Sequence, residues 1–423
     1  MTKLKATTSL RNGQSPAGGA DGTEAAPPSL VDIRRHNLSA TLKSVRDHGQ
    51  VTRADLIAES GLNRVTILHL VNELQDMGLI QESGLAATGR SGRPARVLEM
   101  SDSRIAVGAL ELNVDHIAIK CTSLQGRVIF TRRKEVSASD HAAAFVLDLA
   151  AEMIDQASAA ASSENMRLVR VSIGCPAFVD NANGVVLKSL SLGWADVRVV
   201  GELEKRCGGA VAFTLDKLAD LAIHAERQMG RFPSQEGVLL LYGEMGVGGS
   251  FQKNSEILRG DAGMGGQFGH LTVNPGGRRC YCGRNGCLET YVGVAPLSLA
   301  LEGSTGHHST SAAARVSEAL AAVQQGADVA RRELAQQGAW LARAVSTLTA
   351  IFDPRVIILG GYLTQLAPLL MPAFEQELRI YSEGEFSHAT EMAVSQLGTG
   401  AVLDGGIATA INDLVRAPWT LAQ

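Results

Sequence analysis

The 423-residue sequence has no long hydrophobic run. A membrane-spanning helix needs roughly 18 consecutive apolar residues, and no stretch approaches that length, so membrane-spanning classes are excluded. Residues 1–29 contain three basic side chains but no apolar segment after them, which argues against a secretory signal. We therefore expect a disordered tail over residues 1–29 and a cytoplasmic protein without membrane contact.

The sequence also contains few cysteines and no excess of positive charge. Six cysteines are too few for a disulfide framework in a chain of this length. The net charge is −4, which argues against a uniformly basic coat for nucleic acid. The charge is unevenly distributed, however, because residues 1–100 carry 12 Lys or Arg against 10 Asp or Glu. A slightly basic N-terminal part precedes an acidic body, and the total length predicts two or three domains.

Residues 30–100 have the pattern of a small helical DNA-binding domain. Apolar residues recur at helical spacing from Leu30 until Gly49 ends the run, and Thr52 with Asp55 forms a capping-box-like start for a second helix. Asn63 is the expected N-cap of a third helix. Four apolar side chains share one face of that third helix: Ile67, Leu70, Val71 and Leu74. This order predicts a helix-turn-helix, whose last helix enters the major groove.

A wing is expected after the third helix. Short strands near residues 79–80 and 97–100 flank the loop GRSGRPAR, and arginines on such a loop suit phosphates or a narrow minor groove. The alternative is a helical dimerisation module with a solvated basic loop. The predicted contacts to a double-stranded DNA operator are Asn63, Arg64, Thr66, His69, Asn72, Arg90, Arg93 and Arg96.

Residues 101–423 have the alternating pattern of an α/β fold. Val- and Ile-rich strands are expected at 168–174, 210–215, 238–243 and 355–361, and helices at 142–162, 312–351 and 405–415. About 320 residues exceed one ordinary hydrophobic core. We therefore expect two lobes, one of residues 104–220 with 397–423 and one of residues 221–396.

The strongest chemical signal is a cluster of possible metal ligands. Cys280, Cys282 and Cys287 lie within eight positions, and His270 precedes them. One imidazole and three thiolates complete a tetrahedral zinc site with no open position, which is typical of structural zinc. We expect one such zinc per chain. The alternative is a reduced cysteine cluster without metal.

These features together resemble the ROK family of bacterial repressors and sugar kinases. The resemblance extends from about residue 34 to the end of the chain. Besides the wing and the cysteine block, it depends on CPAFVD (175–180), GVGGS (246–250), DPRVIILGG (353–361) and TGAVLDGG (399–406). It implies a two-lobed actin-like ATPase (ribonuclease H-like) fold that closes over a sugar, and assembly into a homodimer or homotetramer.

The resemblance also assigns the nucleotide site, which is degenerate here. Kinases of the family have Asp-x-Gly-Gly-Thr where this sequence reads Glu111-Leu112-Asn113-Val114-Asp115, and Thr where it has Met245. Side chains replace the glycines that let the backbone approach phosphate, and Asp115 adds an anion. We therefore expect no ATP binding and no enzyme activity.

On the sugar side, the resemblance assigns four residues to a sugar or sugar phosphate. Asp216 matches the general base of the kinases, although Leu215 replaces its Asn neighbour. Gln267 stands where the family has Glu, while His270 and Glu289 match their counterparts. A capped turn is the alternative role for Asp216. The sequence thus predicts a sugar-responsive transcriptional repressor of sugar-metabolism genes, with a sugar kinase or a sensor of a protein partner as alternatives.

Overall fold

The computed structural model describes residues 29–85, 95–230, 232, 236–261, 263–305, 311–381 and 390–422. The expected tail lies outside this part of the chain, apart from Ser29. Within the described residues, none of the helices has the length and apolarity to cross a membrane.

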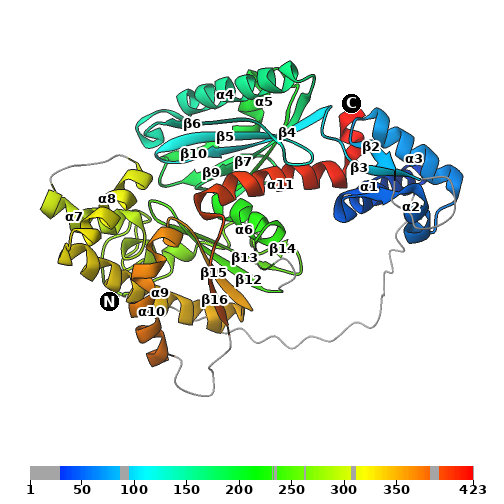
Figure 1. Ribbon diagram of the computed structural model, residues 1–423. Helices are drawn as coiled ribbons and strands as arrows, with labels where there is room; N and C mark the ends of the chain where they lie inside the picture. Colours follow the sequence, from blue (N-terminus) through cyan, green and yellow to red (C-terminus); the bar gives the residue numbers. More distant parts are fainter. Residues whose placement is uncertain are drawn as a thin grey trace, which may run out of the picture.

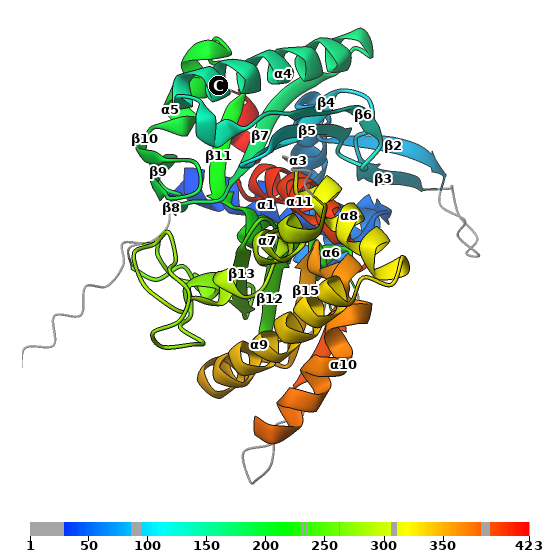
Figure 2. The ribbon, with the colours of Figure 1, turned by 90° about the vertical axis from the view of Figure 1, so that its left-hand side faces the viewer.

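The N-terminal part folds as the predicted winged helix-turn-helix. Helices α1 (Leu30–His48), α2 (Arg53–Ser60) and α3 (Arg64–Asp76) pack beside an antiparallel sheet of order β1-β3-β2. Its strands are β1 (Val51–Thr52), β2 (Ile80–Leu85) and β3 (Arg96–Met100). The expected capping box between Thr52 and Asp55 is present. Strands β2 and β3 extend away from the helices (Figure 2) and form the sides of the wing.

The first lobe contains a five-stranded sheet of order β11-β7-β4-β5-β6. Its strands are β4 (Ile105–Leu112), β5 (His116–Ser123), β6 (Val128–Glu135), β7 (Arg167–Cys175) and β11 (Ala212–Lys217). Helices α4 (Ala143–Ser163) and α5 (Val199–Arg206) cover its outer face (Figure 1). Both faces are buried, because Leu110 and Leu112 of β4 pack in the cluster with α4 whereas Val107 and Ala109 pack in the cluster with the C-terminal helix.

A small antiparallel sheet lies beside the first lobe and contributes to the cleft described below. It consists of β8 (Phe178–Asp180), β9 (Val185–Ser189) and β10 (Trp194–Val197) in the order β10-β9-β8. Gly184, in the turn before β9, has a φ of 64° and packs so closely against Val200 that an added Cβ would lie 2.3 Å from that side chain. A glycine is therefore required at this turn.

The second lobe, like the first, contains a five-stranded sheet with both faces covered. Its sheet has the order β14-β13-β12-β15-β16. The strands are β12 (Val238–Gly243), β13 (Val247–Lys253), β14 (Glu256–Ile257), β15 (Val356–Gly361) and β16 (Glu391–Val394). One face packs against α6 (Leu218–Gln228) and the other against α7 (Val294–Thr305), α8 (Ala312–Gln324), α9 (Asp328–Phe352) and α10 (Leu363–Tyr381). The expected helical run over 312–351 is two helices, separated at Gly326 with a φ of 87°.

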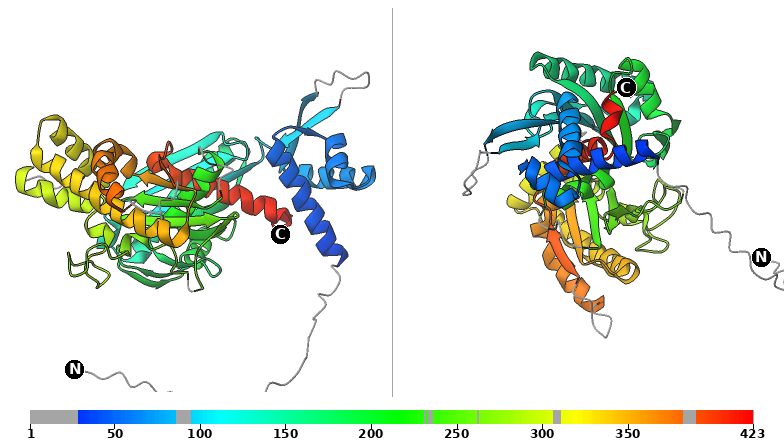
Figure 3. Two further views of the ribbon diagram at one scale, coloured as in Figure 1. Left: turned by 90° about the horizontal axis from the view of Figure 1, so that it is seen from below. Right: turned by 90° about the vertical axis from the view of Figure 1, so that its right-hand side faces the viewer.

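Helix α11 (Ala401–Arg416) connects the lobes to the N-terminal domain. It begins four residues before the predicted helix and runs between the two sheets toward α1 (Figure 1). Figure 3 shows the end of α11 beside α1 from below. Leu414 and Val415 of α11 belong to the same hydrophobic cluster as Leu38 and Leu42 of α1. One continuous core therefore joins the DNA-binding fold to the body.

Candidate DNA-binding and effector sites

Helix α3 presents the predicted DNA-contacting side chains on its solvent side. Arg64, His69 and Asn72 are exposed and Thr66 is half-buried. Asn63 has a structural role as well, because its Oδ1 accepts a hydrogen bond from the Thr66 backbone N–H at 2.9 Å and so caps the helix. The NH2 group of the Asn63 side chain takes no part in this contact. The N-cap and the four helical residues lie along one element, as expected for a recognition helix.

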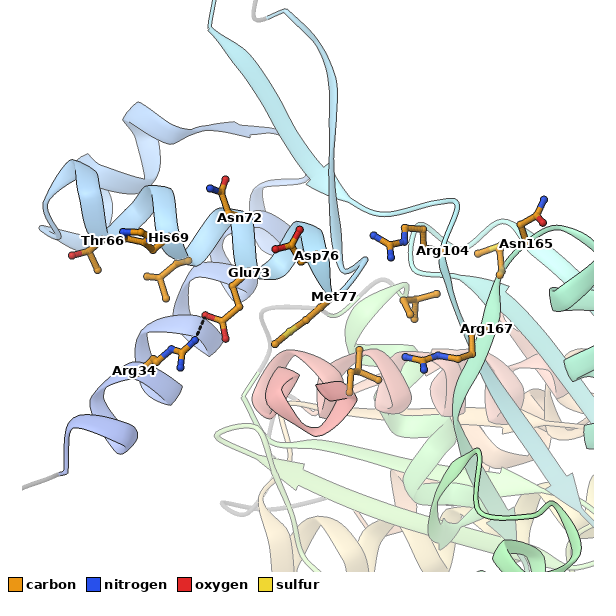
Figure 4. A pocket seen from close by; sticks show the side chains of 14 residues that line it. Arg34, Thr66, His69, Asn72, Glu73, Asp76, Met77, Arg104, Asn165 and Arg167 are labelled. Carbon is orange, nitrogen blue, oxygen red and sulfur yellow. Dashed lines mark ion pairs between the residues drawn. The ribbon is translucent and has the colours of Figure 1, made fainter. Parts of the chain in front are cut away.

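Part of this surface faces the body across an open cleft of about 1140 Å³ (Figure 4). Thr66, His69 and Asn72 line the α3 side of the cleft. Arg104 and Arg167 line the side formed by the first lobe. Two cations of the body therefore share a cleft with the recognition helix, a feature that sequence periodicity did not reveal.

The wing is described only in part. Arg96 begins β3, has an exposed side chain and forms an ion pair with Glu82 of β2 at 2.5 Å. Arg90 and Arg93 lie outside the described residues. Their assignment to DNA, like that of Arg96, stays a prediction.

Two exposed apolar residues of α3 were not among the predicted DNA contacts. Val65 and Leu68 are 63% and 45% exposed, although they belong to a helix with a well-buried opposite face. Exposed apolar side chains on a recognition helix suit the methyl group of thymine in the major groove. The signal was available in the sequence, because both residues fall outside the i, i+3, i+4, i+7 set that forms the core.

The four predicted metal ligands meet in space. The ligand atoms of His270, Cys280, Cys282 and Cys287 all lie within 4.8 Å of one another. The sulfur atoms of Cys282 and Cys287 are 3.6 Å apart, and the Cys280 sulfur lies 3.7 Å from His270 Nδ1. Zn–S bonds of about 2.3 Å in a tetrahedron require ligand separations of this size. The cluster can therefore hold a metal ion.

The electrostatics of the cluster favour a thiolate at Cys282. Burial opposes ionisation, but hydrogen bonds from the Arg284 backbone and side chain, together with the neighbouring thiols of Cys280 and Cys287, lower the pKa of Cys282 to about 6. Metals bind the deprotonated sulfur, so this environment suits a cation. Gly286 completes the loop with a φ of 80°, where an added Cβ would lie 1.8 Å from the Asn274 carbonyl oxygen.

His270 of the cluster lines a cleft of about 680 Å³ between the two lobes. Gln267, His270 and Glu289, three of the four predicted sugar-binding residues, line it. Contacts around the cysteine loop hold His270 and Glu289 in position, since Glu289 Oε1 lies 2.8 Å from His270 Nδ1 and the Tyr281 hydroxyl donates to Glu289 Oε2 at 2.8 Å. The expected sugar site is thus brought together at these three positions.

Asp216, the fourth predicted sugar residue, does not join them. Among the described residues that line the cleft, its neighbour Lys217 appears but Asp216 does not. Asp216 Oδ1 accepts hydrogen bonds from Arg259 at 2.9 Å and from the Asn181 side-chain amide at 2.6 Å. Burial raises the pKa of Asp216 to about 6, against the opposing effect of the Arg259 cation. The carboxylate that matches the family base therefore forms an ion pair with Arg259 of the same chain.

The cleft contains cations that the sequence patterns did not indicate. Lys217 is buried, donates to the Gly265 carbonyl oxygen at 2.6 Å and lines the interior, while Lys188, Arg278 and Arg279 line the cleft from exposed positions. The acidic side chains of the lining are Glu289 and Glu244. Burial and the nearby Glu111 raise the pKa of Glu244 to about 8, which keeps it largely neutral at pH 7. Cationic side chains therefore outnumber anionic ones in this cleft.

Some of the glycines in GVGGS (246–250) and DPRVIILGG (353–361) have packing roles. An added Cβ at Gly249 would lie 2.3 Å from the Phe268 ring, and one at Gly246 would lie 2.8 Å from Glu289 Oε2. At Gly361 it would lie 2.2 Å from the Gly243 carbonyl oxygen. Close packing therefore requires glycine at Gly249 and Gly361. At Gly246 the nearest atom is the end of the flexible Glu289 side chain, and at Gly248 the nearest atom is 3.8 Å away, so packing does not require glycine at these two positions.

A family model described as ROK family matches residues 107–412. The chain belongs to the ROK family. It is 25% identical over 404 residues to the DNA-binding transcriptional repressor Mlc of Escherichia coli strain K12, covering 90% of this chain and 97% of the relative.

Two solved structures show the same fold. A ROK family transcriptional regulator described as a homolog of the E. coli MLC protein superposes with a TM-score of 0.73 at 22% identity, covering 92% of this chain and 100% of that one. A ROK family glucokinase from Streptomyces griseus, in complex with glucose and AMPPNP, has a TM-score of 0.61 at 23% identity and covers 72% of this chain and 99% of that one. The predicted fold, a winged helix-turn-helix followed by a two-lobed actin-like body, is confirmed.

Proposed function

We propose that this protein is a transcriptional repressor that binds operator DNA through residues 30–100 and responds to a sugar or sugar phosphate held by residues 101–423. The arrangement of α11 is the observation that carries the proposal. This helix packs against α6 behind the cleft at one end and against α1 of the DNA-binding domain at the other. A ligand that changes the separation of the lobes would thereby change the placement of α3. Such coupling requires that the ligand bind two conformations with different affinity.

The assembly proposed for this function is a homodimer or homotetramer. Two winged domains on one symmetric assembly would bind two half-sites, and the linked binding compensates for the small net positive charge of each domain. Zinc is the proposed metal, one ion per chain. His270, Cys280, Cys282 and Cys287 would hold it in a closed structural site, and its role would be to hold Glu289 and Gln267 in place.

The operator-binding role is tested with Arg64→Ala. Arg64 is exposed at the start of α3, where an arginine can bind the edge of guanine, so we expect about a tenfold loss of operator affinity at fixed salt. The matched control is Arg379→Ala, which removes an exposed arginine from α10 in the second lobe. Binding is measured by fluorescence anisotropy on a selected operator. Equal affinities for Arg64→Ala and the wild type would contradict the assignment.

The effector is tested by thermal shift against monosaccharides, their 6-phosphates and sugar acids. A ligand of the folded state raises the unfolding midpoint. Because cations predominate in the cleft, we expect anionic sugars to produce the larger shift, and Lys188→Gln to reduce their affinity about fivefold. Lys253→Gln, which removes an exposed lysine from β13, is the control. If none of these compounds raised the unfolding midpoint, the alternative would be a regulator that senses a protein partner. A pull-down from cells grown with and without sugar would detect such a partner.

A sugar kinase is the second candidate, favoured by the retained Asp216 and by the likeness of the body to a glucokinase. The ion pair of Asp216 with Arg259 and the substituted loop at residues 111–115 count against it. The test is ATP-dependent phosphorylation of a sugar. Activity in the wild type that is absent in Asp216→Asn would establish a kinase, and the cleft would then bind a substrate and not only an effector.

A further inference from the structure

A buried polar network occupies the place where the family resemblance puts the phosphate loop. Asp115, in the turn between β4 and β5, accepts a hydrogen bond through Oδ2 from the backbone N–H of Ala312 at 2.7 Å. Ala312 is the first residue of α8, in the other lobe. The contact joins residues 197 positions apart in the chain. Asp115 is 7% exposed, so this bond between the lobes is shielded from water.

Neighbouring side chains hold the Asp115 carboxylate in position. Its Oδ1 lies 2.7 Å from Nδ1 of His116, whose Nε2 lies 3.2 Å from Glu111 Oε1. Asn113 donates to Glu111 at 2.9 Å and to Glu244 of the second lobe at 3.4 Å. The four first-lobe residues of this network are each at most 7% exposed. Two separate contacts therefore cross from the β4–β5 turn to the second lobe.

The charges of the network suit an internal ion pair. Burial alone would lower the pKa of His116, but the hydrogen bond with Asp115 and the nearby Glu111 carboxylate raise it to about 10, so the imidazole is cationic at neutral pH. Burial acts to raise the pKa of Asp115, and the bonds from His116 and the Ala312 N–H outweigh it and lower that pKa. Arg133 adds a second nearby cation. A carboxylate is therefore stable here without a bound ligand or metal.

The first turn of α8 explains why a carboxylate is favourable at this place. The first four N–H groups of a helix lack partners within the helix, and the helix dipole favours negative charge there. Ser311 caps one of them by accepting from the Ala314 N–H at 3.3 Å. Asp115 takes the Ala312 N–H, a position that an anionic ligand could otherwise occupy.

We propose that Asp115 is an interlobe latch: its carboxylate occupies the N-terminus of α8 and holds the two lobes together, so that the chain itself sets how far the cleft opens. In this arrangement the substitutions at residues 111–115 have a positive function beyond the loss of a nucleotide site. Where the family kinases have glycine backbone, this chain has side chains that connect the two lobes.

The latch is tested on the full-length protein with Asp115→Ala. We expect backbone hydrogen exchange in the first turn of α8 and in the β4–β5 turn to become about tenfold faster, since a charge-assisted bond at a helix N-terminus is lost. We also expect a larger radius of gyration by small-angle X-ray scattering, because the lobes separate. Asp140→Ala, which removes an exposed carboxylate from the nearby 3₁₀ turn Ala138–Asp140, should change neither measurement.

Two further variants separate a latch from a local helix cap. Ser311→Ala frays α8 without touching Asp115, so it should accelerate exchange in α8 alone and leave the β4–β5 turn and the radius of gyration unchanged. Asp115→Asn keeps the acceptor oxygen and the volume but loses the charge. If Asp115→Ala does not fold, Asp115→Asn takes its place. We expect hydrogen exchange in this variant to be about threefold faster than in the wild type, and the radius of gyration to be larger. The proposal would be overturned, in whichever variant folds, if neither exchange nor the radius of gyration changed. It would also be overturned if exchange became faster in α8 alone with an unchanged radius of gyration, as expected for Ser311→Ala.

Discussion

Replacing Cys282 by serine is expected to abolish metal binding at the proposed zinc site and so to lower the free energy of unfolding by several kcal/mol. Structural zinc binding is worth on the order of 10 kcal/mol, and a closed site with four ligands loses most of this when one thiolate becomes a hydroxyl. The sulfur of Cys282 lies 3.6 Å from that of Cys287, so the substitution opens the cluster directly. Metal content by mass spectrometry and thermal unfolding measure the two effects.

The matched control is Cys207→Ser, which replaces a half-buried cysteine outside the cluster, at the end of α5. It should retain about one metal per chain and unfold within about 1 kcal/mol of the wild type. Glu289 lies beside His270, one of the proposed zinc ligands, so a metal-free Cys282→Ser protein should lose the proposed response to sugar before it loses operator binding. A Cys282→Ser protein that still binds one metal ion per chain would contradict the assignment of the site.

Gly405→Ala should destabilise the protein by about 3 kcal/mol, the second large effect that the structure predicts. An added Cβ at Gly405 would lie 1.7 Å from the Leu221 carbonyl oxygen of α6. That atom belongs to the backbone, so α11 and α6 must move apart to admit a methyl group. Because α11 continues into the core shared with α1, the same displacement should change operator affinity. Chemical unfolding and operator titration measure the two effects.

A second glycine in a helix provides the comparison for this substitution. Gly201 of α5 has no atom within 4 Å of the position where a Cβ would be added. Gly201→Ala should therefore leave the stability unchanged or raise it by up to about 1 kcal/mol, because alanine favours the helix more than glycine does. If Gly405→Ala behaved like Gly201→Ala, the close packing of α11 on α6 would not be important for stability.

The elements that could be predicted from the sequence are those determined by neighbouring residues. The capping box of α2 needs only Thr52 and Asp55, and the buried face of α3 needs only a helical repeat. The cluster of possible metal ligands could also be predicted, because its three cysteines fall within eight positions. Local interactions of this kind do not depend on how the rest of the chain folds.

The missed features involve residues that are distant in the chain. The sequence did not reveal that Arg259, 43 residues from Asp216, engages the carboxylate of that predicted sugar residue. No periodicity indicates such a pair, because the approach of the loop after β14 to the end of β11 depends on the packing of one lobe against the other. The helical run at 312–351 was predicted as continuous for a similar reason, since apolar spacing on both sides of Gly326 hides the change of direction.

By itself, the sequence determined the winged helix-turn-helix, the α/β character of the body and the ligands of the proposed zinc site. Only the tertiary structure decided which of the predicted sugar residues share a cleft, that α11 joins the cleft to the DNA-binding domain, and that Asp115 of one lobe binds the first turn of α8 in the other. Caps, helical faces and metal loops form from contacts within a few residues. The cleft and its connections form where two sheets and a terminal helix pack together, and that packing depends on the shape of the whole molecule.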